Sequence, residues 1–358
     1  MVNNCPTNRN RGDHLARDSK AFYVSKLVPE LQLQLQRRYR ILQMIQAASP
    51  VGRRALADML HVTERVVRNE TMILKQEGLI EIKQIGMFCT ELGNETVEEL
   101  REYIHEVSGL TSKERQLAQL LNVQQAVIVS GDASKLEQLM MLGKEAAQRL
   151  TYFANDKDII AVTGGSTIAA MSEHLKPVAP LHSVQFIAAR GGLGSQMHDQ
   201  ANTIVANFGQ QTNATYKTLF VPENLSKESY DAIRNEPVIA EVTDLYHQVS
   251  IVVHGIGNAE QMAKRRNSSG ETLQILKEQQ ATSEAFGYYF NAKGEVVHQL
   301  PSIGINLKQV KNARTVLAVA VGKEKVAAIM GYFNHHMPQT CFITDEVTAD
   351  AILEKVNL

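Results

Sequence analysis

A chain of 358 residues is long for one compact unit, and its 44% hydrophobic content can fill more than one core, so we expect one small and one large domain. Its three cysteines, Cys5, Cys89 and Cys341, lie far apart without Cys/His ligand spacing, which argues against both a disulfide framework and a metal site. No apolar run reaches about 18 residues, and the polar start has no hydrophobic signal core, so we expect a soluble cytoplasmic protein with no membrane partner.

Charge is distributed unevenly along the chain, although the 37 Lys and Arg nearly balance the 38 Asp and Glu. Residues 1–84 hold 14 basic and 8 acidic side chains, a net +6, which leaves −7 for the rest because the whole chain carries −1. A basic N-terminal region on an acidic body predicts a polyanionic partner for that region alone.

The chain begins with polar residues and then becomes helical. Residues 1–20 lack periodicity and are expected to form a disordered arm. From Leu27 a helix is predicted by apolar residues that recur on one face, namely Leu31, Leu35, Leu42 and Ile45. It should end near Ser49-Pro50, because the residue before a proline resists the helical conformation.

Two further helices and a hairpin follow. Residues 53–60 form a short predicted helix, and Thr63 is the predicted N-cap of a third helix that reaches about Gln76 and ends at Gly78. Two strand-like runs, 79–83 and 87–90, are joined by a tight turn at Ile85-Gly86. This order predicts a winged helix-turn-helix, which we assign to residues 21–107.

The third helix carries the main signal for binding double-stranded operator DNA. Its predicted inward residues are Val66, Val67, Ile73 and Leu74, and its predicted outward residues are Arg65, Arg68, Asn69 and Met72. Arginine and asparagine suit guanine and adenine edges in a major groove, whereas an ordinary solvated helix face is the alternative. The predicted DNA contacts also include Thr63 and, at backbone phosphates, Arg53, Arg54, Lys75 and Lys83.

A break at Ser108-Gly109 is the predicted linker to a second domain, residues 108–358. The amphipathic helix after it could pair two subunits or pack against its own domain. Strand candidates then alternate with helix-length segments, and they are 126–130, 159–163, 184–189, 216–221, 250–255, 315–320 and 340–344. Continuous apolar strands of this kind are typical of a parallel sheet covered on both faces, so we predict a doubly wound, Rossmann-like α/β domain.

In such sheets ligands bind beyond the carboxyl ends of the strands. The turn formed by Gly164, Gly165, Ser166 and Thr167 follows a strand and precedes a helix whose predicted inward stripe is Ile168, Met171 and Leu175. Glycines allow close backbone approach, and a helix N-terminus favours an anion, so the turn could bind a phosphate or could be purely structural. It lacks both the P-loop lysine and the dinucleotide GxGxxG pattern.

Other strand-end segments add cations. Arg190, in AARGGLG, suits a carboxylate or phosphate, although a salt bridge to a neighbouring acid is the alternative. Arg265 and Arg266 follow the loop of HGIGNAEQMAKRRN and make a second anion site possible, although such a run usually ends a solvated helix. In EAFGYYFN, a buried strand by its composition, Glu284 could accept sugar hydroxyls, and Lys325 follows Gly322 in AVAVGKEK. Several glycine loops with cations suggest a ligand with two phosphates.

A sugar-phosphate isomerase or lactonase-like enzyme is the alternative, because such enzymes use similar sheets. The candidates for its general base are His254, Asp132, Asp199, Glu284 and Asp345. They form no recognisable constellation, and a lone histidine at a strand end is more often packed or hydrogen-bonded than a base. GxSxG and HExxH are also absent from the sequence, so we expect no catalytic residues and no cofactor.

The motifs together resemble those of the SorC-type sugar-responsive repressors. The resemblance runs from about Leu27 to the C-terminus, residues 1–20 having no recognised counterpart, and is carried by VGRRAL, TERVVRNE, KQEGLI, SGDASK, VTGGST, ARGGLG, QANTI, LFVPE, VHGIGNAEQMAKRRN and EAFGYYFN. It implies an oligomeric repressor, a dimer or tetramer, of an operon for glyceraldehyde-3-phosphate dehydrogenase and lower glycolysis. The implied effector is fructose 1,6-bisphosphate, bound without catalysis in a domain similar to phosphosugar isomerases.

The resemblance also implies positions for the effector. One phosphate would lie on Gly165, Ser166 and Thr167 with Lys325 nearby, and the pocket would be completed by Arg190, Gln200, Arg265 and Glu284. One departure from the family pattern is Val321-Gly322, where members tend to have two glycines.

Overall fold

The computed structural model describes residues 23, 27–133, 136–192, 197–222 and 227–356. The predicted disordered arm, residues 1–20, lies outside these ranges. The chain divides into two compact units, Met1–Glu114 and Arg115–Leu358, which are considered separately below. The predicted boundary at residues 107 and 108 stays a prediction.

The first unit contains a winged helix-turn-helix, as predicted. Its elements are α3 (Pro29–Ala48), α4 (Arg53–Leu60), α5 (Glu64–Gln76), β1 (Ile80–Lys83), β2 (Gly86–Cys89), α6 (Glu91–Glu99) and α7 (Arg101–Val107). The hydroxyl of Thr63 accepts a hydrogen bond from the N–H of Val66 at 3.4 Å, which makes Thr63 the N-cap of α5. Gly78, with φ of 74°, lets the chain leave α5 in a left-handed conformation.

The hairpin turn differs from the prediction by one residue. Lys83 pairs with Gly86, so Gln84 and Ile85 form the loop rather than Ile85 and Gly86. Gly86 instead begins β2 close to Val51, whose N–H and carbonyl exchange hydrogen bonds with Met87. A Cβ on residue 86 would lie 2.9 Å from the backbone nitrogen of Val51, which explains why glycine occurs where the two backbones approach closely.

The larger unit is built on a parallel sheet of seven strands, which confirms the predicted fold class. Their order is β3-β13-β12-β7-β4-β5-β6, and their bounds are β3 (Gln125–Val129), β4 (Ile159–Val162), β5 (Gln185–Ala188), β6 (Thr215–Lys217), β7 (Val249–Gly255), β12 (Thr315–Val319) and β13 (Thr340–Asp345). Each strand candidate from the sequence overlaps one of these strands. The candidate at 216–221 is longer than the strand it overlaps, because β6 ends at Lys217. Beyond that point the backbone N–H of Leu219 donates to the side chain of Asn202 at 2.7 Å rather than to a neighbouring strand.

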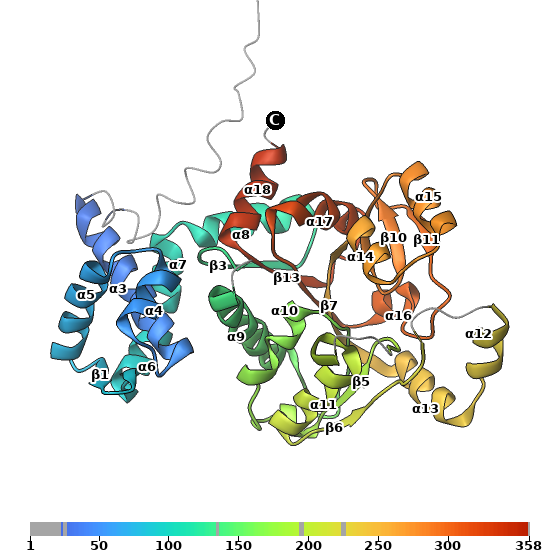
Figure 1. The fold of residues 1–358 in the computed structure, drawn as a ribbon, viewed down its shortest axis with the longest axis horizontal. Coiled ribbons are helices and arrows are strands. Elements are labelled where there is room, and N and C mark those ends of the chain that lie inside the picture. The colour runs from blue at the N-terminus through green and yellow to red at the C-terminus, as the bar shows by residue number, and fades with distance from the viewer. Residues whose placement is uncertain (1–22, 24–26, 134–135, 193–196, 223–226, 357–358) are drawn as a thin grey trace, which may run out of the picture. The chain divides into compact units, whose positions relative to one another are not determined.

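Helices cover both faces of this sheet. Figure 1 shows α9 and α18 on opposite sides of the strand pair β3–β13. The helices that the chain forms from residue 110 onwards include α8 (Leu110–Leu121), which crosses the division between the units, α9 (Leu136–Phe153), α10 (Ser166–Ala169), α11 (Ala201–Thr212), α12 (Lys227–Ile233), α13 (Pro237–Leu245), α16 (Leu307–Asn312), α17 (Val326–Phe333) and α18 (Glu346–Val356). None of the helices in the described ranges is long and apolar enough to cross a membrane.

The helix predicted after the turn at 164–167 is much shorter than expected. Ile168, Met171 and Leu175 are all buried, as the stripe predicted, but α10 is followed by a separate 3-10 turn, η1 (Ser172–His174). Pro177 follows closely, and the residue before a proline avoids the helical region, so helical structure has to end before Lys176.

A small antiparallel sheet was not predicted. Its order is β11-β10-β9-β8, with bounds β8 (Gly257–Asn258), β9 (Ala281–Ala285), β10 (Tyr288–Asn291) and β11 (Val296–Gln299). It packs with α14 (Ala259–Arg265) and α15 (Gly270–Glu278) around Tyr289 and Leu300. EAFGYYFN is therefore a hairpin rather than one strand, because Gly287 adopts a φ of 83° in the turn after Phe286.

Candidate functional site

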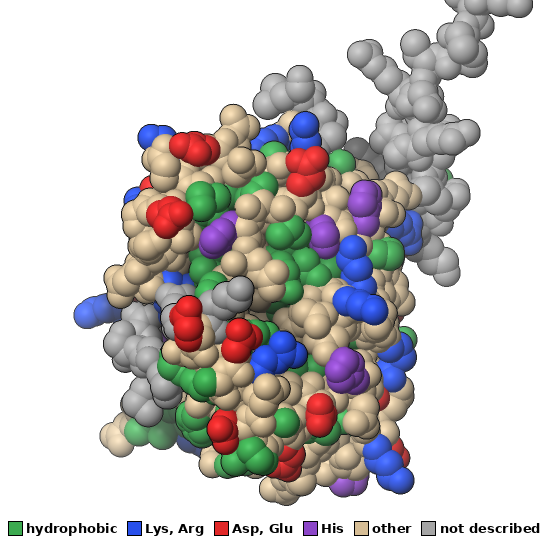
Figure 2. All heavy atoms as spheres, turned by 90° about the vertical axis from the view of Figure 1, so that its right-hand side faces the viewer, with side chains coloured by type: hydrophobic (Ala, Val, Ile, Leu, Met, Phe, Trp, Pro, Cys, Tyr) green, Lys and Arg blue, Asp and Glu red, His purple; other side chains and the backbone are tan. Residues whose placement is uncertain are grey.

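The outward face of α5 has the composition that the sequence predicted. Arg65, Arg68, Asn69 and Met72 are exposed, whereas Val67 and Leu74 are buried, with Val66 and Ile73 half-buried. A hydrogen-bonding face of this kind on the second helix of a helix-turn-helix can enter a major groove. In the larger unit, by contrast, Figure 2 shows basic and acidic side chains interspersed over the face near α12, α13 and α15, without the single-sign field that binds nucleic acid.

The residues predicted to contact DNA phosphates are all exposed, and two of them pair with a neighbouring carboxylate. Arg53 and Lys75 are exposed. Arg54 forms a salt bridge with Glu64 at 2.9 Å, and Lys83 forms one with Glu81 at 2.8 Å. Both pairs are solvent-exposed, and exposed pairs contribute little energy, so these cations can exchange partners readily.

Sequence reasoning missed a partly buried ion pair that joins α5 to α3. The carboxylate of Glu70, on the inward side of α5, accepts a hydrogen bond from the Arg38 side chain at 2.8 Å and lies 3.7 Å from the guanidinium of Arg37. The spacing of apolar residues along a helix gives no signal for a charged residue on the inward face. The acidic residue on a predicted inward face, together with the Arg37-Arg38 pair on another helix, is the signal that could have found it.

In the larger unit, the turn at 164–167 lies at the carboxyl end of β4 and packs against the segment before α11. Gly165 has a φ of 131° and donates its N–H to the carbonyl of Asp199 at 2.8 Å. A Cβ on Gly164 would lie only 2.6 Å from that carbonyl oxygen. The N–H groups of Ser166 and Thr167 belong to the first turn of α10, where a helix offers no acceptor, so they can serve an anion.

Asp199 links the same turn to Arg265 and Gln200. The Arg265 guanidinium is 3.7 Å from a carboxylate oxygen of Asp199, and its side chain is 49% exposed. Gln200 is the N-cap residue of α11, directly after Asp199. The structure therefore brings Arg265, Gln200 and the 164–167 turn together around one aspartate.

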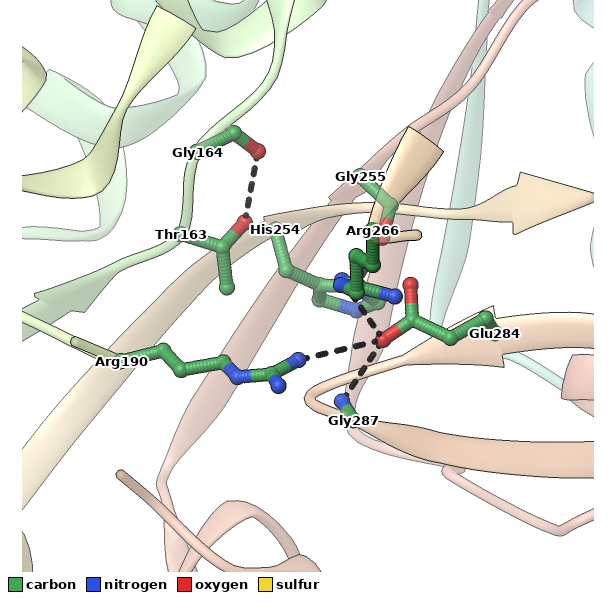
Figure 3. A network of polar contacts seen from close by, with 8 residues as sticks. All are labelled: Thr163, Gly164, Arg190, His254, Gly255, Arg266, Glu284 and Gly287. Atoms are coloured by element: carbon green, nitrogen blue, oxygen red, sulfur yellow. Dashed lines mark hydrogen bonds and ion pairs between the residues drawn. The ribbon is translucent and has the colours of Figure 1, made fainter. Parts of the chain in front are cut away.

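Arg190, Arg266 and Glu284 form a second cluster, shown in Figure 3. The Oε1 atom of Glu284 lies 3.2 Å from Nη2 of Arg266 and 3.5 Å from Nη1 of Arg190, and it accepts the Gly287 N–H at 2.7 Å. Arg190 and Glu284 are only 8% and 4% exposed. The salt bridge weighed as an alternative for Arg190 is therefore present, and the two guanidinium groups and one carboxylate leave a net charge of +1.

Lys325 lies in the turn after β12. Gly322 carries the positive φ of this turn, 116°, and its carbonyl accepts the N–H of Lys325 at 2.9 Å. Val321, the departure from the family pattern, is buried and does not have a positive φ, so a second glycine is not required there. Burial lowers the pKa of Lys325, and the nearby Glu324 opposes that shift.

His254 is a packed histidine rather than an available base. It is fully buried, its Nδ1 contacts the carbonyl of Gly255 at 2.9 Å, and its Nε2 contacts the Tyr332 hydroxyl at 3.1 Å. Burial lowers the pKa of His254 to about 4. Because a carbonyl can only accept, Nδ1 carries the proton and Nε2 accepts from Tyr332, which leaves neither nitrogen for a substrate.

The remaining candidate bases also serve the fold. Asp345 is fully buried and accepts the N–H groups of Ala133 and Thr348 at 2.6 and 2.8 Å. Asp199 and Glu284 face the arginines described above, and Asp132 lies near Asp345, raising its pKa in addition to burial. The described residues include no cluster of His, Cys, Asp and Glu that could hold a metal ion.

Two family models match the chain in succession. Residues 34–104 match the "CggR N-terminal DNA binding domain", and residues 105–354 match Sugar-bind, the "Putative sugar-binding domain". The chain is 41% identical over 329 residues to the "Central glycolytic genes regulator" of Bacillus subtilis, covering 92% of this chain and 96% of the relative. It is 27% identical over 228 residues to the "Transcriptional regulator LsrR" of an Enterobacter species, covering 59% of this chain and 66% of that protein.

Solved structures give the same assignment. A SorC family transcriptional regulator from Enterococcus faecalis is 37% identical, with a TM-score of 0.63 over 67% of this chain and 99% of the other. The full-length sorbitol operon regulator SorC from Klebsiella pneumoniae, at 17% identity and a TM-score of 0.61 over 88% and 99%, supports the fold alone. These relatives are regulators with a DNA-binding domain, so the enzyme alternative is set aside. The chain is a sugar-responsive, DNA-binding repressor of the SorC family, related to the central glycolytic genes regulators.

Proposed function

We propose that this repressor controls an operon that encodes glyceraldehyde-3-phosphate dehydrogenase and other enzymes of lower glycolysis, and that fructose 1,6-bisphosphate induces it. The name of the relatives that are about 40% identical supports the operon. The observation that supports the effector is the presence of two separate arginine groups, Arg265 beside the 164–167 turn and Arg190 with Arg266 at Glu284. A bisphosphate needs a cation at each end.

In this proposal one phosphate lies on the 164–167 turn and the other interacts with the buried arginines. The proposed effector contacts are Gly164, Gly165, Ser166, Thr167, Arg190, Gln200, Arg265, Arg266, Glu284 and Lys325. The contacts that Glu284 makes with Arg190, Arg266 and Gly287 use Oε1, and a sugar hydroxyl could donate to the other carboxylate oxygen. The ligand is an effector and not a cofactor, because it regulates DNA binding and is not consumed.

The proposed operator contacts follow the geometry of α5. Arg65, Arg68 and Asn69 face base edges, while Arg53, Arg54, Thr63, Lys75 and Lys83 face the backbone. A homo-oligomer, a dimer or a tetramer, would hold two or more of these units in register with operator half-sites in the cytoplasm. Because coupling between two ligands is reciprocal, operator DNA must weaken the bisphosphate by the same factor by which the bisphosphate weakens operator DNA.

The test is operator binding by the purified full chain in the presence of a panel of sugar phosphates, at one fixed salt concentration because affinity falls steeply with salt. Fructose 1,6-bisphosphate should release the operator at lower concentration than monophosphates do. The variant Arg265→Ala should lose this release, whereas Lys264→Ala, which removes the neighbouring exposed cation paired with Glu260, should retain it. An Arg265→Ala protein that responds like the parent would contradict the site assignment, and equal responses to all sugar phosphates would contradict the effector.

A further inference from the structure

Three neighbouring strands of the large sheet, β3, β13 and β12, end side by side, and the segment after β13 is bonded to the loops on both sides of it. On one side, Asp345 accepts the N–H of Ala133 at 2.6 Å. On the other side, the hydroxyl of Thr348 accepts the N–H of Gly322 at 2.8 Å. The loop that follows β12 is thus held by a residue of α18.

Thr348 is held by burial and by its own backbone. It is fully buried, and its backbone N–H donates to Oδ1 of Asp345 at 2.8 Å. The nearby Thr348 side chain opposes the increase in the pKa of Asp345 that burial causes. A hydroxyl oxygen accepts hydrogen bonds through its lone pairs, and the Gly322 N–H supplies the donor here.

The bond to Gly322 matters because Gly322 begins the turn that presents Lys325. With a φ of 116°, Gly322 occupies a conformation that few other residues adopt, and the turn is closed by the bond from the Lys325 N–H to its carbonyl. Residue 325 is also the N-cap of α17, so the start of that helix and the base of the lysine side chain share one anchor. The Lys325 side chain is half-buried, so a displaced backbone changes where its ammonium group lies.

We propose that Thr348 is a positioning residue of the effector site, whose hydroxyl fixes the 322–325 turn and thereby places the Lys325 ammonium for a phosphate of the ligand. This role rests on the proposed function of Lys325 as an effector contact. Thr348 itself touches no ligand and acts through Lys325. The affinity of the site for phosphate would therefore depend on this buried hydroxyl as well as on the charged residues that contact the ligand.

The test compares Thr348→Val, which keeps the shape but lacks the hydroxyl, with Thr348→Ser, which keeps the hydroxyl. Calorimetry with fructose 1,6-bisphosphate should show binding about tenfold weaker for Thr348→Val, equivalent to one misplaced charged contact, and near parental for Thr348→Ser. In a second pair, Lys325→Met and Lys325→Met with Thr348→Val should bind equally, because Thr348 has nothing left to position. Amide hydrogen exchange of residues 322–326 should rise in Thr348→Val and not in Thr348→Ser.

The outcomes separate the two proposals. Parental affinity in Thr348→Val, or losses that add in the double variant, would overturn the role of Thr348 while leaving the effector in place. A parent protein that binds no sugar phosphate would overturn the proposed effector and this role with it. If Thr348→Val does not fold, Thr348→Cys replaces it, because its thiol keeps most of the volume and accepts hydrogen bonds only weakly.

Discussion

Replacing Glu284 by glutamine removes one negative charge from between two buried guanidinium groups and changes almost nothing else. The amide oxygen can still accept the Gly287 N–H, which lies 2.7 Å from Oε1 in the parent. The contacts of 3.2 Å with Arg266 and 3.5 Å with Arg190 lose their ionic component. The change therefore isolates the charge balance of the cluster.

The expected size of the effect follows from distance and burial. With an effective dielectric constant of about 20, a charge pair at roughly 3.3 Å is worth about 5 kcal/mol before desolvation. Breaking a buried pair by removing one partner costs about 3–5 kcal/mol, and retention of the amide hydrogen bond places Glu284→Gln at the lower end, about 3 kcal/mol. The side chains are 5–10% exposed, so solvent screens the cluster only weakly.

The variant should also change how the protein responds to inorganic phosphate. In the parent, Glu284 competes with any anion for both arginines, whereas in Glu284→Gln an anion supplies the missing charge. Phosphate should therefore bind at least about tenfold more tightly to the variant, which adds about 1.4 kcal/mol of stabilisation at saturating phosphate.

Urea unfolding at several phosphate concentrations measures both effects, with potassium chloride at matched ionic strength as the salt control. Glu354→Gln, which removes an exposed carboxylate on α18 of the same unit, is the matched variant and should stay within about 0.5 kcal/mol of the parent. If Glu284→Gln is equally stable, or if phosphate stabilises it no more than the parent, Glu284 does not act as the internal counter-ion of Arg190 and Arg266.

Three further predictions concern the DNA-binding unit and the buried histidine. Arg68→Ala should weaken operator binding by about 1–3 kcal/mol and non-specific DNA binding much less. Lys75→Ala should weaken both kinds of binding equally and reduce the salt dependence by about one phosphate contact. Titrations on operator and scrambled DNA distinguish the two patterns. A double-mutant cycle of Arg38→Ala and Glu70→Ala should give a coupling energy of about 1.5–3 kcal/mol in thermal or urea unfolding, because this hydrogen-bonded ion pair is partly buried. If the losses of stability in the two single variants simply add, the pair does not stabilise the fold. The pKa of His254 is about 4 in the folded protein and about 6.5 when unfolded. The unfolded state therefore takes up a proton first as the pH falls, so the stability that the neutral form contributes is complete above pH 6.5 and is lost towards pH 4. Between pH 7 and 5 the free energy of unfolding of the parent should fall by about 2 kcal/mol more than that of His254→Gln.

The features that could be predicted from the sequence are those encoded by neighbouring residues. The helix caps at Thr63 and Gly78 and the apolar strand runs depend on local propensity and burial, and the structure confirms them. The small sheet was missed because its strands are short, β8 having two residues, and because β9 and β10 were read as one aromatic run. The pairing of Glu70 with Arg38 was missed for a different reason, since it joins two helices through a charged residue on a face assumed to be apolar.

The residues proposed for the effector site illustrate the same limit. The sequence predicted which strand ends carry cations, but it left a salt bridge and an anion site as alternatives for Arg190. The structure shows that these are not exclusive, because Arg190 meets Glu284 from the small sheet, an element whose position depends on the tertiary fold. Likewise, the sequence located a glycine loop at Val321-Gly322 but not which residue carries the positive φ, nor that the Gly322 N–H donates to the hydroxyl of Thr348 from a distant helix.

The chemistry of this sheet edge favours sensing over catalysis. A general base must be able to gain and lose a proton close to the substrate, and its pKa must lie near the working pH. His254 is held neutral with both nitrogens bonded, and Asp345 accepts two backbone N–H groups far from any surface. Glu284 lies between two arginines and pairs with both of them. Under the proposed function, the site binds an anion with fixed cations and releases it unchanged, and the energy of that binding shifts the equilibrium between operator-bound and released protein.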